Sequence, residues 1–226
     1  MDIRIFKDNF SIEKARKAQS LLSRQIIFRD MLPKEIRYVA GVDVAYSDEF
    51  AFGAVAVLEY STLNLIESQT TIYKITFPYI PTLLSFRELP PAVLCIRKLK
   101  IQPDVFLVDG HGFAHPYRCG FASHLGVVLK KPTIGVAKSR LIGGIEYPED
   151  KDFAYLKHNG ELIGAVLKRM QSQRPVYISV GHMVSLETAV KIVKHCARHS
   201  NIPEPLIKAH QLAAKARNQM YRLKNL

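Results

Sequence analysis

The stretch PDVFLVDGHGFAHPYRCG, Pro103–Gly120, begins with a continuous apolar run at positions 105–108. A run of this length and β-branched content predicts a strand that is buried on both faces. Asp109 ends the run, and Gly110 and Gly112 follow, so the chain leaves the strand through an open turn. Ligands of parallel sheets bind at the carboxyl ends of strands, which makes Asp109 a candidate functional residue. An Asp–Gly pair also caps turns, so the stretch alone leaves both roles open.

The segments around this strand predict an α/β fold with a mixed central sheet and helices on both faces. Three strand-like segments precede it, and their short polar connections predict antiparallel neighbours. Helical and extended segments alternate after them, which predicts parallel crossovers. The predicted strands are residues 38–47, 51–60, 65–77, 105–108, 132–136, 153–158, 161–168 and 175–180, and the predicted helices are residues 11–26, 82–89, 92–100, 122–129, 185–199 and 205–223.

Local signals set several of these boundaries. Ser11 can cap the first helix, since serine is favoured at that position. The pair Pro90-Pro91 interrupts the helical pattern of residues 82–100, because proline lacks the backbone donor that a helix needs. Asn159-Gly160 between two extended segments is a strong hairpin signal. The predicted apolar face of the first helix consists of Ile12, Ala15, Leu22 and Ile26.

Composition limits the class of protein. A chain of 226 residues with 48% hydrophobic residues can bury a substantial core, and we expect one domain that spans residues 1–226. Lys and Arg outnumber Asp and Glu by 32 to 20, a net charge of +12 that favours an anionic polymer or a membrane surface as partner. The carboxyl-terminal region from Lys191 is strongly basic, with Glu204 as its single acid. A basic helix can also be a solvated face, so this signal alone is weak.

The cysteines and the apolar runs indicate a cellular compartment. The three cysteines are scattered, which fits a reducing environment and gives no thiolate metal motif. The first ten residues contain no apolar segment of signal-peptide length, and no apolar run approaches the roughly 20 residues of a membrane helix. We therefore expect a cytoplasmic protein with no membrane partner, and we expect a monomer.

Three carboxylates occur on separate predicted elements. Asp43 interrupts an otherwise apolar strand, where an unpaired charge costs several kcal/mol, so it must lie at a cleft, pair with a cation or be protonated. Asp109 ends a second strand, and Glu88 lies in the helix between the two parts of the sheet. Such a set suits Mg²⁺ or Mn²⁺, which take oxygen ligands and retain waters and substrate phosphates. With the basic charge this indicates phosphodiester chemistry, although three acids in a chain of this length are an ordinary count.

Five segments of the chain resemble the motifs of the endonuclease V family, inosine-specific nucleases of DNA and RNA repair. They occur in the order of the family and extend over nearly the whole chain. The chain departs from the family at His111, where bacterial members usually have Gln, and at Thr82, where Gly commonly follows the Pro-Tyr-Ile-Pro motif. Neither departure removes a candidate metal ligand. The matching segments are VAGVD at 39–43, ITFPYIP at 75–81 with SFRE at 85–88, VDGHG at 108–112 with AHP at 114–116, PTIGVAKS at 132–139, and IPEP at 202–205 followed by AH at 209–210.

The resemblance implies a ribonuclease H-like fold and a divalent-metal-dependent endonuclease. The implied substrate is deoxyinosine, or deaminated adenine, in DNA. The implied reaction hydrolyses the second phosphodiester bond 3′ to the lesion and leaves 3′-hydroxyl and 5′-phosphate ends. Asp43 and Asp109 would coordinate Mg²⁺, for which Mn²⁺ can substitute, and Glu88 would be a third acidic ligand or a partner through water.

Two further residues receive catalytic roles from the resemblance. Lys138 would contact the phosphate or the attacking water, although by itself it indicates only a solvated loop lysine. His210 would assist water activation or a second metal position. It shares a helical face with Leu206, Ala213 and Ala214, so without the resemblance it indicates a core histidine.

The Pro78–Pro81 loop has its own physical logic. Prolines on both sides restrict the backbone, so Tyr79 and Ile80 are presented on a stiff support. An aromatic wedge can replace the stacking lost when a base is extruded for inspection. Loop tyrosines usually just lie on the surface, so the wedge hypothesis rests mainly on the resemblance. The substrate-binding residues that it implies are Tyr79, Ile80, Pro81, Gly110, Gly112 and Leu141, with the turns at 110–112 and 141–143 forming the pocket for hypoxanthine.

Two alternative functions stay open. One is a related ribonuclease H-like nuclease that cleaves inosine-containing RNA, hybrids or junctions. The other is a non-catalytic module that binds nucleic acid through its basic carboxyl-terminal region while the carboxylates only cap turns. A passive binder would show salt-dependent affinity and no strand scission when divalent ions are added.

Overall fold

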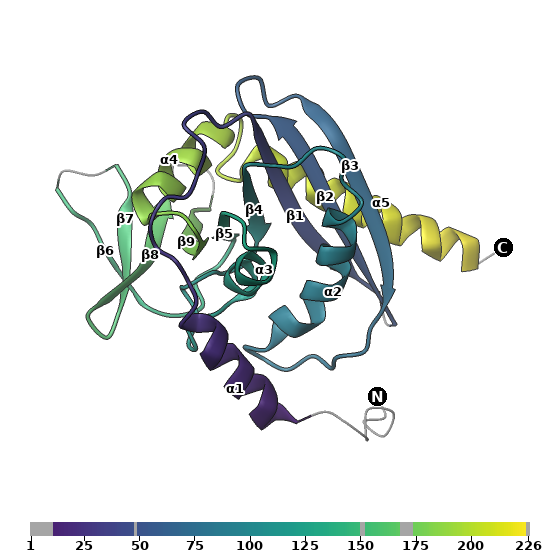
Figure 1. Cartoon of the computed structure of the whole chain (residues 1–226), viewed down its shortest axis with the longest axis horizontal. Helices are drawn as coiled ribbons and strands as arrows, with labels where there is room; N and C mark the ends of the chain where they lie inside the picture. Colours follow the sequence, from purple (N-terminus) through teal and green to yellow (C-terminus); the bar gives the residue numbers. More distant parts are fainter. Residues whose placement is uncertain (1–10, 48, 150–151, 168–173, 225–226) are drawn as a thin grey trace.

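The computed structural model describes residues 11–47, 49–149, 152–167 and 174–224 (Figure 1). The first ten residues, in which the sequence predicts no signal peptide, lie outside these ranges, and so does position 168, the predicted end of a strand. The elements in chain order are α1 (Ile12–Ser23), β1 (Tyr38–Tyr46), β2 (Phe50–Glu59), β3 (Leu65–Lys74), α2 (Leu84–Ile96), β4 (Val105–Asp109), α3 (Phe121–Leu129), β5 (Thr133–Ala137), β6 (Gly144–Glu146), β7 (Ala154–His158), β8 (Glu161–Leu167), β9 (Val176–His182), α4 (Leu186–Cys196) and α5 (Glu204–Lys224).

The described strands form one mixed sheet in the order β3-β2-β1-β4-β5-β9-β8-β7-β6. The antiparallel pairing of the first three strands and the parallel pairing of β1 with β4 and of β4 with β5 are confirmed. Parallel pairing ends there, because β9 runs antiparallel to β5. The described chain between β5 and β9 consists of the antiparallel strands β6, β7 and β8 with their turns, and it lacks the helix that usually connects parallel neighbours. The prediction of parallel strands was therefore wrong beyond β5.

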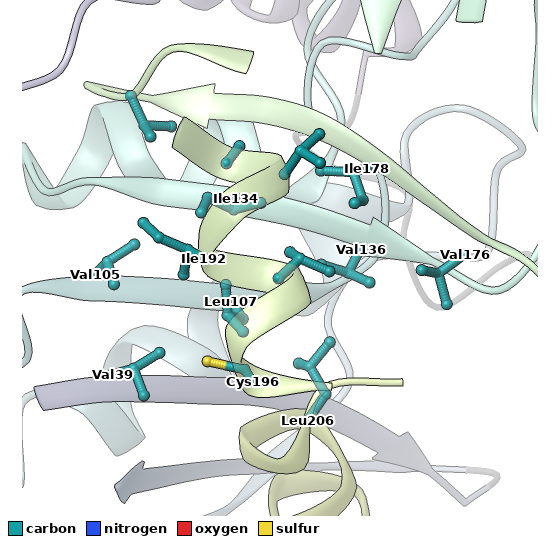
Figure 2. Packing of buried hydrophobic residues seen from close by; sticks show 14 of the residues in the cluster. Val39, Val105, Leu107, Ile134, Val136, Val176, Ile178, Ile192, Cys196 and Leu206 are labelled. Atoms are coloured by element: carbon teal, nitrogen blue, oxygen red, sulfur yellow. The ribbon is translucent and has the colours of Figure 1, made fainter. Parts of the chain in front are cut away.

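Helices cover both faces of the sheet, as predicted. On one face, α2 and α3 bury Cys95 and Leu125 against Val55 and Phe106. On the other face, α4 and α5 pack on the alternate residues of the same strands. Figure 2 shows this second layer, in which Ile192 and Cys196 of α4 and Leu206 of α5 lie over side chains of the sheet. The labelled sheet residues are Val39, Val105, Leu107, Ile134, Val136, Val176 and Ile178.

The pair Pro90-Pro91 does not divide the helical region in two. Residues 84–96 form one helix, with both prolines inside it. A Cβ on Gly53 of β2 would lie 2.6 Å from the carbonyl oxygen of Pro91, and the Cys95 thiol donates to the Gly53 carbonyl at 3.0 Å. The close packing of α2 on β2 thus holds the helix together where local propensity alone predicts a break.

Other boundaries differ by a few residues. Ser11 caps α1 as predicted, accepting a hydrogen bond from the backbone N–H of Lys14. The predicted apolar face is only partly correct, because Ile12 is 52% exposed and α1 ends at Ser23. The hairpin at Asn159-Gly160 is confirmed by the pairing of β7 with β8. β6 was missed, since three residues are too few to show a periodicity.

The three cysteines, Cys95, Cys119 and Cys196, are buried free thiols. Burial raises the pKa of Cys95 to about 11 and those of Cys119 and Cys196 to about 12, so these thiols stay protonated at neutral pH. Within the described ranges, no helix combines the length and the apolar character that a membrane crossing requires.

The start of α5 lies directly against β1. A Cβ on Gly41 would lie 2.0 Å from the carbonyl oxygen of Pro205 and 2.7 Å from the nitrogen of Leu206. The glycine therefore allows a helix backbone to approach a strand backbone more closely than any side chain would permit. This contact determines where the rest of α5 lies, including His210, relative to β1.

Candidate active site

Two carboxylates meet at the carboxyl ends of adjacent parallel strands. β1 and β4 pair in register through Val42 and Val108, so Asp43 and Asp109 occupy the next position on each strand. Side chains two residues apart on a strand point to the same face of the sheet. Asp43 therefore shares a face with Gly41, and Asp109 shares a face with Leu107, which is the face covered by α5. Asp43 is buried, and its Oδ1 accepts a hydrogen bond from the Val44 backbone N–H at 2.8 Å. The sheet register thus brings together two residues that are far apart in the sequence.

His210 completes the cluster from α5. Its Nδ1 lies 2.8 Å from Oδ2 of Asp43, and its side chain is 60% exposed whereas that of Asp43 is 10% exposed. One ligand atom from each of Asp43, Asp109 and His210 lies within 4.8 Å of the other two. Two carboxylates and one imidazole at this spacing form a possible metal site. His210 is not the core histidine that its helical face alone indicated.

Glu88 approaches the same carboxylates from α2. Burial raises its pKa well above the usual value, and the negative charges of Asp43 and Asp109 raise it further. The pKa of Asp109 is also raised, chiefly by burial and then by the charge of Asp43. A buried carboxyl group whose pKa is raised by neighbouring negative charges is stabilised in its ionised form when a divalent cation binds beside it. The donor set therefore fits a hard metal ion.

Lys138 supplies a positive charge beside the cluster. It follows β5, whose Val136 pairs with Asp109, and its Nζ forms an ion pair with Oδ2 of Asp109. This contact lowers the pKa of Asp109 and opposes the effect of burial. The Lys138 side chain remains 48% exposed, so the ammonium group can contact a ligand as well as the carboxylate. It is thus more than a solvated loop lysine.

A cavity of about 250 Å³ adjoins the carboxylates and shares Glu88 and Asp109 with them. Four of the predicted substrate-binding residues line it, namely Tyr79, Pro81, Gly110 and Leu141.

Two other predicted residues, Ile80 and Gly112, are not among the residues that line this cavity. Gly112 packs against β9 instead, because its N–H donates to Oγ of Ser179 at 2.8 Å and a Cβ would lie 2.2 Å from the Val180 carbonyl oxygen. It therefore shapes the turn without facing the cavity.

The Pro78–Pro81 loop presents Tyr79 at the mouth of this cavity, with 66% of the side chain exposed. The next residue after the loop, Thr82, has φ of 68°, in the left-handed region that a β-branched residue rarely occupies. This conformation gives a physical reason for the glycine that is common at this position in the family that the sequence resembles. The backbone turn is kept here with threonine in place of glycine.

Residues of α1 hold this loop, and sequence reasoning missed them. Nε2 of Gln19 donates to the carbonyl oxygens of Thr82 at 2.9 Å and of Cys119 at 2.8 Å. Arg16 donates to the carbonyls of Pro81 and Thr82 and stacks over the ring of Tyr117 at 4.0 Å. Gln19 is only 1% exposed. The available signal was a polar residue on the predicted apolar face of the helix, which indicates a buried hydrogen-bonding role.

Two histidines line the cavity in the neutral state. Burial lowers the pKa values of His111 and His115 to about 4 each. His115 accepts a hydrogen bond from the Tyr117 N–H at its Nδ1. Nδ1 of His111 is buried and has no hydrogen-bond partner among the described residues. These two residues of the cavity wall are thus uncharged at neutral pH.

Comparisons with known proteins agree on one family. Its profile, described as Endonuclease V, matches residues 20–211. A protein of Thermofilum pendens named endonuclease V is 43% identical over 222 residues, which cover 97% of this chain and 95% of that one. An endonuclease V structure from Streptomyces avermitilis has a TM-score of 0.88 at 34% identity and covers 94% of this chain and 96% of that one.

A third match is a crystal structure of Ciona intestinalis endonuclease V in complex with a 24-mer DNA that contains an inosine followed by a ribo-adenosine. It has a TM-score of 0.83 at 34% identity and covers 92% of this chain and 98% of that one. The ribonuclease H-like α/β architecture implied by the sequence motifs is confirmed by these structural matches. Profile, sequence identity and fold all extend over most of the chain, and the protein therefore belongs to the endonuclease V family.

Proposed function

We propose that the protein is a divalent-metal-dependent endonuclease of DNA repair that recognises deoxyinosine and hydrolyses the second phosphodiester bond on its 3′ side. The products would carry 3′-hydroxyl and 5′-phosphate ends. The observation that supports this most directly is that the possible metal site adjoins the cavity: Asp109, one of its three residues, lines the cavity together with Glu88, whose pKa the charge of Asp109 raises. An extruded base in the cavity would place its own strand beside the cluster.

The metal ligands would be Asp43 and Asp109, with Glu88 as a third ligand or a partner through water. Mg²⁺ is the proposed ion, with Mn²⁺ as a substitute, because both prefer oxygen donors and keep open positions for water and phosphate. When bound, the ion would polarise the scissile phosphate and lower the pKa of a neighbouring water. The pKa values of Glu88 and Asp109 are both raised, chiefly by burial and then by the charge of Asp43, and this supports a site that is completed by a cation.

The residues around the metal position would orient the reactants. His210 holds Asp43 through Nδ1, and its exposed ring leaves the other nitrogen free to accept a proton from the attacking water. Lys138, held by Asp109, would donate to a non-bridging phosphate oxygen and stabilise its negative charge. Both side chains are exposed enough to meet a substrate and are also fixed by a carboxylate, which reduces the entropy cost of positioning them.

Recognition of the lesion would use the cavity and the loop at its mouth. The exposed Tyr79 would fill the space vacated by the extruded base, and Gly110 and Leu141 would contact the base. The contacts from Gln19 and Arg16 hold the carboxyl end of the loop, so the wedge has a fixed base. Stiff support lowers the entropy that insertion would cost.

The proposed function is tested by a nicking assay on matched strands that contain inosine or adenine, in DNA and in RNA. Strand scission at the second bond 3′ to inosine is expected only with Mg²⁺ or Mn²⁺. Binding without scission under all metal conditions would favour the passive nucleic-acid-binding module. The RNA arm tests the second candidate substrate, which is suggested by the ribo-adenosine that follows the inosine in the DNA bound to the Ciona relative.

Replacing Tyr79 by Ala should weaken discrimination between inosine and adenine by about tenfold, since base–aromatic stacking contributes roughly 1–3 kcal/mol. The ratio of kcat/KM values for the two substrates measures this effect. The affinity for metal, measured from the increase in melting temperature as metal is added, should be unchanged, because Tyr79 is not a proposed ligand. Tyr147→Ala removes a tyrosine that is 79% exposed elsewhere and serves as the control. Equal selectivity of the two variants would contradict the wedge role.

A further inference from the structure

A polar stripe runs along α5 away from the possible metal site formed by Asp43, Asp109 and His210. Gln211, Lys215, Asn218 and Arg222 are exposed and follow one another at intervals of three or four residues, so they lie on one face of the helix. These four residues and His210 line a shallow hollow of about 450 Å³. His210 is the link, because its Nδ1 contacts Asp43 while its ring borders the hollow. We call the four side chains after His210 the α5 stripe.

The chemistry of the stripe suits an anion. All four side chains donate hydrogen bonds, and two of them carry a positive charge. The acidic residue of α5, Glu204, lies in its first turn, at the opposite end of the helix from Arg222. Among the described residues, no carboxylate forms an ion pair with Lys215 or Arg222. Their charges are therefore available to a partner outside the protein.

The dimensions of the stripe suit an extended polymer. From His210 to Arg222 the helix rises by roughly 18 Å at about 1.5 Å per residue. This length corresponds to roughly five nucleotides at about 3.4 Å per phosphate along one strand. The last turns of α5 extend past the edge strand β3, so the sheet does not cover them (Figure 1). Ala214 also lines the hollow, and its small side chain leaves room for a strand to lie close to the helix.

The α5 stripe and the cavity adjoin the group of Asp43, Asp109 and His210 through different residues. Asp109 and Glu88 line the cavity, His210 borders the stripe, and the two hollows have no lining residue in common. A strand with its damaged base in the cavity must pass the cluster before it reaches the stripe. Because the proposed cut lies 3′ to the damaged base, the part of the strand that continues beyond the cluster is its 3′ part.

We propose that the α5 stripe binds the sugar–phosphate backbone of the nucleotides on the 3′ side of the scissile bond. This inference rests on the proposed function and adds to it a phosphate-binding track of defined polarity. The track contacts phosphates without reading bases, so it increases affinity for any sequence. Its contribution to affinity is electrostatic. This contribution decreases as the salt concentration increases, because the release of counterions from the nucleic acid is then less favourable.

The test compares the double variant Lys215→Ala/Arg222→Ala with the wild type on inosine-containing DNA of two lengths. One substrate extends at least ten nucleotides 3′ of the cut, and the other ends one nucleotide beyond it. On the long substrate the variant should have a KM about tenfold higher, with kcat within about twofold of the wild-type value. On the short substrate the variant and the wild type should have equal KM values, because the stripe has nothing to bind.

Salt dependence gives a second readout. Loss of two phosphate contacts lowers the slope of log affinity against log salt by about 1.8, or by about 1.4 for a single strand. Between about 50 and 200 mM salt, the increase in KM should therefore be roughly tenfold smaller for the double variant than for the wild type. The variant Lys215→Arg/Arg222→Lys keeps both charges and should restore the KM and the salt slope.

The control is Lys34→Ala/Arg37→Ala, which likewise removes one lysine and one arginine, here just before β1 and therefore at the end of this strand away from Asp43. Its KM and salt slope should be those of the wild type. A stripe variant that behaves like this control on the long substrate would overturn the proposal and leave the proposed function intact. If the wild type itself does not nick inosine strands with Mg²⁺, the proposed function fails instead.

Discussion

Asp43→Asn and Asp109→Asn should each reduce strand cleavage in Mg²⁺ by about 10³-fold, or roughly 4 kcal/mol of transition-state stabilisation. Asparagine keeps the shape of the side chain and removes the charge that a hard cation requires. An asparagine side chain in place of Asp43 can still accept the hydrogen bond from the Val44 N–H, so β1 should keep its local structure. The loss should therefore appear in catalysis and leave the fold intact.

Two measurements separate catalysis from binding. Single-turnover nicking in Mg²⁺ should show the loss, while the affinity for uncut inosine-containing DNA, measured in Ca²⁺, should change by less than about threefold. Asp104→Asn is the control, since Asp104 directly precedes β4, at the end of the strand away from Asp109. Its Oδ2 accepts hydrogen bonds from the backbone N–H groups of Arg37 and Tyr38. Full nicking by both the Asp43 and the Asp109 variants would end the assignment of these residues as metal ligands.

Gly41→Ala should destabilise the protein by about 3 kcal/mol, at the upper end of the cost of overpacking a core. The new methyl group would lie 2.0 Å from the Pro205 carbonyl oxygen, and both partners are backbone, so neither can rotate away. Relief requires α5 to move off β1, which separates His210 from Asp43. Cleavage should consequently decrease even under conditions in which the variant is folded.

Urea unfolding measures the stability change as a shift in midpoint at constant m-value. Gly144→Ala is the control, because a Cβ there has no atom within 4 Å, and its stability should stay within about 0.5 kcal/mol of the wild type. If the Gly41 and Gly144 variants unfold at the same urea concentration, the close approach of α5 does not hold the site together.

The strands and the layers were predictable because a buried strand or helix face requires apolar residues at regular positions, and this pattern is visible in the sequence. The run at 105–108 is apolar at every position, and the structure buries it on both faces as β4. Asn159-Gly160 likewise predicted its hairpin, because the turn requires residues that tolerate positive φ, and both have it. Failures occurred where a partner distant in sequence decides the outcome, as at Pro90-Pro91, where packing on Gly53 keeps α2 continuous.

Some residues of the candidate site were likewise recognisable from the local sequence, and others were not. Asp43 stood out because a charge inside an apolar strand needs an explanation, and Asp109 stood out because it ends a strand. His210 and Lys138 carried no such local anomaly, and their roles came from resemblance to known motifs. Gln19 was missed because one polar residue on a helix face resembles an ordinary break in amphipathicity.

By itself, the sequence determined which segments are extended or helical, which faces are apolar and which carboxylates are unusual, because these properties depend on residues that are near in the chain. Tertiary structure alone decided that β9 reverses direction, that Gly112 faces β9, and that α1 supports the Tyr79 loop. It also decided the distance of 2.8 Å between His210 and Asp43, which lie 167 residues apart. That distance depends on how closely a helix can approach a strand at Gly41, and no local pattern records such an approach.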